Sequence, residues 1–165
     1  MAAKDKNSSA SRNFLVQLLV EAFMRATLDL ALDSRVTLIP IPSSSSANRR
    51  RGFKHAHLLS NSLAEKAQGR FSEPLKVTGA LRVNRRIADQ SGLNKSQRVQ
   101  NINGAYSVIP KLGRQLLESS PDATFLVDDL LTSGSTAQEG VRALKMAGTS
   151  LQGVLCAGVS PRLFS

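Results

Sequence analysis

The stretch Phe125-Leu126-Val127-Asp128-Asp129-Leu130-Leu131-Thr132-Ser133-Gly134-Ser135-Thr136 decides the fold of this chain. It predicts an apolar strand over 124–128 that ends in two carboxylates, then a small hydroxyl-rich loop, then a helix. Carboxylates accept hydrogen bonds from vicinal sugar hydroxyls. A helix that opens after a glycine-containing loop offers backbone N–H groups and a partial positive charge to a phosphate. The stretch therefore predicts a sugar-phosphate site.

Apolar periodicity predicts one domain over residues 11–165, preceded by a disordered polar tail over 1–10. Helices are expected over 11–33, 53–67, 111–118 and 135–147, with one or two helical turns within 96–102. Strands are expected over 36–39, 75–77, 81–83, 105–109, 124–128 and 151–159. Because strands alternate with helices, we expect an α/β fold with a mostly parallel sheet of about five strands and flanking helices.

The chain has one cysteine, Cys156, which excludes an intramolecular disulfide and a zinc site built from cysteines. No secretory signal is evident, and polar residues at spacings of four interrupt the apolar segment 14–32. That segment is typical of an amphipathic helix and not of a membrane span. We therefore expect a cytoplasmic protein, and the apolar face of this helix is a candidate for packing on a second copy in a homodimer.

Positive charge is concentrated in the middle of the chain. Of a net charge of +10, residues 48–100 carry +9, with twelve Lys and Arg against three Asp and Glu. Such a block indicates an anionic partner, either nucleic acid or a phosphorylated small molecule. Within it, the arginines of 49–51 precede a predicted helix and are suited to clamp phosphate oxygens in pairs.

Two other kinds of site are disfavoured. A nucleotide triphosphatase would need a glycine-rich loop ending in Gly-Lys-Ser/Thr, and no Gly-Lys pair occurs in the chain. His55 and His57 lie two residues apart on a predicted helix, so they point to different faces and make a poor metal site. Phe53 and Tyr106 are the best-placed aromatic rings for stacking on a base, but a place in the core is the better prediction for both.

Three segments together give the chain a family resemblance. The run around Asp128 and Asp129 resembles the phosphoribosyl-pyrophosphate signature of the type I phosphoribosyltransferases. Ile39-Pro40-Ile41-Pro42 followed by Arg51-Gly52-Phe53 is similar to a ComF-family segment, and the spacing of residues within 81–106 resembles that family's next segment. The chain thus resembles a ComF-family protein with a type I phosphoribosyltransferase domain, without the cysteine-rich zinc module of many relatives. His55 stands where relatives usually carry glutamine.

The resemblance implies a small hood over the ligand and a set of roles. Asp128 and Asp129 would be the catalytic pair and would hold the ribose hydroxyls. The 5-phosphate would be wrapped by Thr132, Ser133, Gly134, Ser135 and Thr136. The pyrophosphate would lie beside Ser43, Arg51, Arg85 and Arg86. The segment 84–95, with Lys95, would be a flexible lid. Magnesium would be the cofactor, bound through the substrate and not directly by the protein.

Two functions remain open from the sequence. The chain would bind phosphoribosyl pyrophosphate, or a nucleotide, and transfer the phosphoribosyl group with release of pyrophosphate. Alternatively, it would be a non-catalytic ComF-type protein of competence and DNA uptake, whose basic block binds single-stranded DNA or a DNA-processing partner. A purine or pyrimidine salvage enzyme is a third reading. It would require a base-stacking residue in the hood, which the sequence does not supply.

Overall fold

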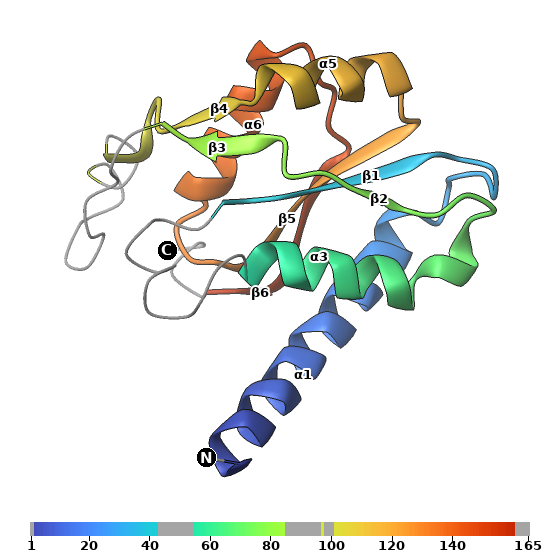
Figure 1. The fold of residues 1–165 in the computed structure, drawn as a ribbon, viewed down its shortest axis with the longest axis vertical. Coiled ribbons are helices and arrows are strands. Elements are labelled where there is room, and N and C mark those ends of the chain that lie inside the picture. Colours follow the sequence, from blue (N-terminus) through green and yellow to red (C-terminus); the bar gives the residue numbers. More distant parts are fainter. Residues whose placement is uncertain (1, 43–54, 85–96, 98–100, 161–165) are drawn as a thin grey trace.

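The computed structural model describes residues 2–42, 55–84, 97 and 101–160 (Figure 1). At its centre lies a four-stranded sheet in the order β2-β1-β5-β6, and all its pairings are parallel. Its strands are β1 (Val36–Pro40), β2 (Lys76–Val77), β5 (Ala123–Leu131) and β6 (Gly153–Val159). The remaining described strands are β3 (Leu81–Val83) and β4 (Tyr106–Val108). The predicted α/β class is confirmed, but the sheet has four strands instead of about five because β3 and β4 pair antiparallel with each other.

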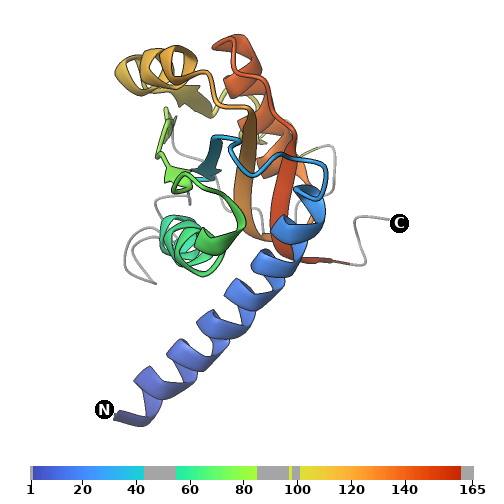
Figure 2. The same cartoon turned by 90° about the vertical axis from the view of Figure 1, so that its right-hand side faces the viewer.

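Helices cover both faces of the central sheet. One face is covered by α1 and α3, and the other by α5, α6 and the β3–β4 pair (Figures 1 and 2). The helices are α1 (Ala2–Ala26), α3 (His55–Lys66), α5 (Pro110–Ser119) and α6 (Ser135–Met146), with a short 3-10 helix, η1 (Gln68–Arg70), after α3. Within the part of the chain that the structure describes, no helix combines the length and the apolar character needed to cross a bilayer.

The central strands are apolar on both sides because both sides are buried. Leu38 and Phe125 contribute to the cluster under α1 and α3. Ile39 and Leu126, the next residues along each strand, contribute to the cluster under α6. All five residues of β1 are buried, as expected for a parallel strand between two helical layers. The uninterrupted apolar runs of the sequence therefore reflect two cores, one on each face.

The sheet has a topological switch point between β1 and β5. From β1 the chain passes through α3 to β2, on one face. From β5 it passes through α6 to β6, on the opposite face and toward the opposite edge. In open parallel sheets, ligands bind beyond the carboxyl ends of the strands at such a point. The topology thus directs attention to Pro42, which follows β1, and to Asp128 and Asp129 on β5.

Helix α1 differs from the prediction at both ends. It begins at Ala2, so residues 2–10 are helical in the structure, where the sequence predicts a disordered tail. Alanines and lysines favour helix here, and the segment holds neither proline nor glycine. The helix ends at Ala26 instead of Asp33, and the buried Thr27 hydroxyl donates to the carbonyl of Phe23 at 2.9 Å. Thr27, Asp29 and Asp33, which are weak helix formers, interrupt the leucines and alanine of the segment that follows.

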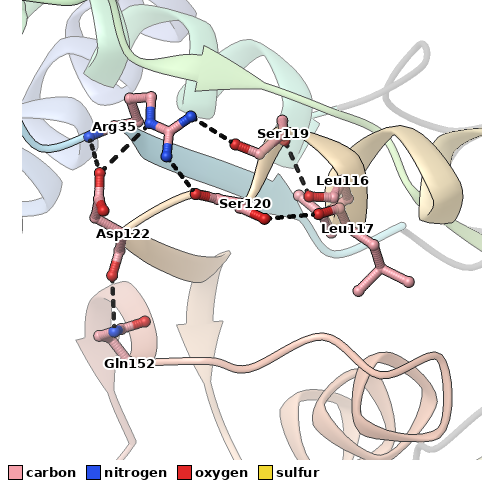
Figure 3. A network of polar contacts seen from close by, with 7 residues as sticks. All are labelled: Arg35, Leu116, Leu117, Ser119, Ser120, Asp122 and Gln152. Atoms are coloured by element: carbon pink, nitrogen blue, oxygen red, sulfur yellow. Dashed lines mark hydrogen bonds and ion pairs between the residues drawn. The ribbon is translucent and has the colours of Figure 1, made fainter.

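A polar network ties the amino ends of the strands to the end of α5 (Figure 3). The Arg35 guanidinium donates to the carbonyls of Ser119 and Ser120 at 3.0 and 2.9 Å. The Arg35 backbone N–H donates to Asp122 Oδ2 at 2.8 Å, and Gln152 donates to the Asp122 carbonyl at 3.2 Å. A cation at a helix C-terminus satisfies carbonyls that lack helical partners. This network therefore stabilises the sheet at the end opposite the two aspartates.

Candidate functional site

Asp128 and Asp129 lie where β5 extends beyond its neighbour β1. Pairing with β1 ends at Pro40 opposite Val127, and the N–H of Ile41 donates to the Val127 carbonyl at 2.8 Å. The sequence predicted that the strand ends at Asp128, but β5 continues to Leu131 because it goes on pairing with β6. The aspartates therefore lie on a stretch of β5 that is paired on one side by β6 and extends past β1 on the other.

The two aspartate side chains leave β5 on opposite faces of the sheet, yet their carboxyl groups interact, since a hydrogen bond with the Asp129 side chain is among the causes that raise the pKa of Asp128. Successive residues of a strand alternate between faces, so Asp128 lies on the face of Leu126 and Asp129 on the face of Val127. Their neighbours agree with this alternation. Asp129 Oδ2 lies 3.8 Å from His55 Nε2 at the start of α3. The charge of Asp128 acts on Tyr106, which packs on the α6 face.

The environment of Asp128 disfavours the ionised form of its carboxyl group. Burial, and then the neighbouring charge of Asp129, raise its pKa to about 7. One contact acts in the opposite direction, because the backbone N–H of Asp129 donates to Asp128 Oδ1 at 2.9 Å. A carboxyl group with such a pKa can accept or release a proton at neutral pH, which is a property of functional sites more often than of structural ones.

The surroundings of Asp128 contain two further polar side chains. Tyr106 is buried and donates its hydroxyl to the carbonyl of Pro42 at 3.1 Å. Burial, and then the charge of Asp128, raises the pKa of Tyr106 well above its usual value. Cys156 is paired with Asp128 across β5 and β6, and the same two causes raise the pKa of its thiol. Both groups stay protonated, so neither is an activated nucleophile.

The hydroxyl-rich loop leads into α6 as expected. Gly134 precedes the helix with φ 72° and ψ −8°, a left-handed conformation that favours glycine. It has no side chain to occupy the first N–H groups of α6, and no acidic residue lies in the first turn. The hydroxyls of Ser133 and Ser135 are 2.8 Å apart, and Thr132 is exposed. The start of α6 thus offers N–H groups, hydroxyls and a partial positive charge to an anion.

His55 is the site residue that sequence reasoning missed. The sequence marks it as a poor metal ligand with His57 and as a departure from the family pattern, but not as a partner of Asp129, and the structure separates the two histidines. His55 approaches Asp129, with about a third of each side chain exposed, whereas the ring of His57 lies beside Gly79. Among the described residues, no group of three or more His, Cys, Asp or Glu side chains has a metal-binding arrangement. The signal that could have found His55 is topological, because a helix that follows β1 begins at the same end of the sheet as the aspartates.

Several predicted site residues lie outside the described part of the chain. These are Ser43, Arg51, Arg85, Arg86 and Lys95. Of the predicted lid, only Asn84 is described. Its N–H donates to the Ala105 carbonyl at 2.7 Å, and its Oδ1 accepts from the Ser107 hydroxyl at 2.6 Å. Asn84 is therefore held against the strand β4.

Comparison with known proteins adds little to this geometry. No protein-family model matches the chain, and no curated protein matches its sequence. A solved structure described as the allosteric regulatory enzyme of purine biosynthesis is similar, with a TM-score of 0.40 and 17% identity. The match covers 87% of this chain but 26% of that one, so the chain spans about a quarter of its length. A likeness at this level carries no argument, and the fold and the site rest on the topology and contacts described above.

Proposed function

We propose that this chain binds phosphoribosyl pyrophosphate, with magnesium carried on the substrate, beyond the carboxyl ends of β1 and β5. The observation that supports this most is the place of Asp128 and Asp129, which extend past β1 at the switch point of a parallel sheet. The 5-phosphate would be bound by residues 132–136, where Gly134 leads into α6. The ribose hydroxyls would donate to the two carboxylates.

The proposed reaction is transfer of the phosphoribosyl group with release of pyrophosphate. The bond from C1 of the ribose to the pyrophosphate oxygen breaks, the oxygen keeps the electron pair, and a nucleophile forms a new bond to C1. Positive charge develops on the ribose ring, and the carboxylates of Asp128 and Asp129 stabilise it electrostatically. Asp128, with its pKa raised to about 7 by burial, is also suited to accept a proton from the nucleophile. Magnesium bound with the substrate would supply positive charge to offset the charge on the leaving pyrophosphate.

Titration calorimetry with phosphoribosyl pyrophosphate and magnesium tests the binding step. Asp128→Asn and Asp129→Asn should each weaken binding by about tenfold or more, because each removes a charged acceptor. Asp122→Asn is the matched control, since it removes a carboxylate from the opposite end of the sheet. Unchanged affinity in both site variants, or no binding by the wild type, would refute the assignment. Pyrophosphate release on adding candidate nucleophiles then tests transfer.

The second candidate function is binding of single-stranded DNA or a DNA-processing partner. Within the described part of the basic block, Lys66, Lys76 and Arg82 are exposed. Arg70 is less suited to bind a phosphate, because its guanidinium donates to the carbonyls of Thr27 and Leu30 within the protein. Exposed cations favour a phosphate backbone, and the logarithm of affinity should then fall linearly with the logarithm of salt concentration. Binding to a fluorescent oligonucleotide that does not respond to salt, or no binding at low salt, would exclude this function.

A further inference from the structure

A charged pair on α6 lies against the strand β4. Arg142 donates to Glu139 through Nε at 2.6 Å and through Nη2 at 2.7 Å. The Glu139 side chain is 3% exposed, and burial alone would raise its pKa. The hydrogen bonds from Arg142 and from the Tyr106 backbone outweigh burial and hold the pKa of Glu139 below its usual value. Glu139 is therefore an ionised carboxylate inside the protein, and such a group is retained only when its partners satisfy it.

The pair occupies the outer edge of β4. The Tyr106 backbone N–H donates to Glu139 Oε1 at 3.0 Å, and its carbonyl accepts from Arg142 Nη2 at 3.1 Å. On the inner edge, Tyr106 lies opposite Val83 of β3, and a hydrogen bond next to this pair runs from the N–H of Asn84 to the Ala105 carbonyl. Glu139 and Arg142 thus give Tyr106 the acceptor and the donor that a further strand would have given. We call this pair the clasp.

The clasp connects to the proposed ligand site in two ways. Ser135, the first residue of α6, lines an open pocket of about 150 Å³ together with both members of the clasp. The Tyr106 side chain reaches the segment that follows β1 and donates its hydroxyl to the Pro42 carbonyl at 3.1 Å. Tyr106 consequently joins the helix behind the phosphate loop, the strand β4 and the chain that leaves β1.

We propose that Tyr106 is a positioning residue, which the clasp holds in place so that the end of β1, Asp128 and the start of α6 keep the spacing that a sugar phosphate requires. This role rests on the proposed function. It adds to that function three residues, Tyr106, Glu139 and Arg142, none of which belongs to the aspartate motif or its loop. It also predicts that ligand affinity responds to a hydroxyl that is buried away from the ligand.

Three variants separate the parts of this proposal. Glu139→Gln keeps the shape and one acceptor oxygen but removes the charge that holds Arg142. Tyr106→Phe keeps the ring and the backbone clasp but removes the hydrogen bond to Pro42. Ser107→Ala is the matched control, because it removes a hydroxyl from the same strand that bonds Asn84 and Arg82 outside the clasp. The readouts are amide hydrogen exchange across β4, the urea midpoint, and calorimetric affinity for phosphoribosyl pyrophosphate with magnesium.

In Glu139→Gln, exchange at the Tyr106 amide should be faster by about tenfold to a hundredfold, because a charge-assisted bond is lost. In Tyr106→Phe, exchange at that amide and the urea midpoint should change little, while affinity falls by about fivefold to tenfold. Ser107→Ala should bind as the wild type does.

Each possible failure has a distinct meaning. Unchanged exchange in Glu139→Gln overturns the clasp, whatever the ligand is. Wild-type affinity in Tyr106→Phe overturns the positioning role while the clasp stands. A wild-type protein that does not bind phosphoribosyl pyrophosphate overturns the proposed function and the positioning role together, and the exchange result then decides the clasp alone.

Discussion

Replacing Asp128 with asparagine should stabilise the folded protein at neutral and alkaline pH. Burial and the charge of Asp129 raise the pKa of Asp128 from its ordinary value of 3.8 to about 7. Between these two values the folded state binds more protons than the unfolded state, so stability is lost as pH rises from about 4 to about 7. Asparagine is close in shape to the protonated acid and carries no charge, and it therefore avoids this cost.

The magnitude follows from the shift. About three pKa units correspond to about 4 kcal/mol at most, at 1.4 kcal/mol for each unit. The site lies at the end of the strand, where solvent and the Asp129 side chain can adjust, so we expect about 2 kcal/mol at pH 8. Near pH 4.5 the wild-type group is protonated in the folded state but mostly ionised in the unfolded state, so only a small part of the difference should remain. Asp129→Asn removes the repulsion between the two carboxylates, which is the second cause of the raised pKa of Asp128, but leaves Asp128 buried. It should therefore give a smaller gain in the free energy of unfolding.

Urea denaturation followed by far-ultraviolet circular dichroism, at several pH values from 4.5 to 8, measures this effect. The gain in free energy of unfolding for Asp128→Asn should grow with pH, while the same variant loses affinity for phosphoribosyl pyrophosphate. A loss of stability at pH 8 would refute the reasoning, because it would mean that the ionised carboxylate is stabilised by its surroundings. A gain of the same size at every pH would also refute it, because it would separate the effect from the charge.

Three further predictions concern other parts of the fold. Asp122→Asn should have the opposite sign: the hydrogen bond from the Arg35 backbone lowers the pKa of Asp122, so its contribution is fully present near neutral pH and declines as pH falls below about 4, and the drop in urea midpoint should be larger at pH 7 than in acid. Gly140→Ala should destabilise by about 1 kcal/mol in the same assay, since a methyl there would lie 2.9 Å from a buried leucine of β5, while Gly69→Ala, in open space, should be neutral. Gly134→Ala should cost about 1–2 kcal/mol because of its positive φ, and calorimetry should show weaker binding of phosphoribosyl pyrophosphate.

The sequence predicts the strands and helices of the sheet well because their signals are local. Apolar runs broken by proline and glycine mark β1, α6 and β6 close to their observed ranges. The α/β fold class follows from the alternation of strands and helices along the chain, since strands separated by helices form parallel sheets. The predictions from sequence fail where contacts between distant elements decide which strands pair. The number of strands in the central sheet depends on whether β3 and β4 join it or pair with each other, and no local signal distinguishes these choices.

The site is only partly visible in the sequence for the same reason. Asp128 and Asp129 are conspicuous because they interrupt an apolar run. Glu139 and Arg142, by contrast, have the spacing of an ordinary surface pair on a helix, and Glu139 is buried within the clasp only because β4 lies against it. Tyr106 was expected in the core and is buried, but the partner of its hydroxyl is 64 residues away in the chain.

The alternation of β5 restricts how one ligand can use both aspartates. Asp128 leaves the strand on the α6 side and Asp129 on the α3 side, and a hydrogen bond between their side chains is among the causes that raise the pKa of Asp128. Within the described part of the chain, pairing of β5 with β1 ends at Pro40, opposite Val127. A sugar held by both carboxylates must therefore lie across the edge of β5, past the end of β1. In that position it would lie near His55, whose Nε2 is 3.8 Å from Asp129 Oδ2, while the buried Tyr106 would act on it indirectly, through the hydrogen bond from its hydroxyl to the Pro42 carbonyl.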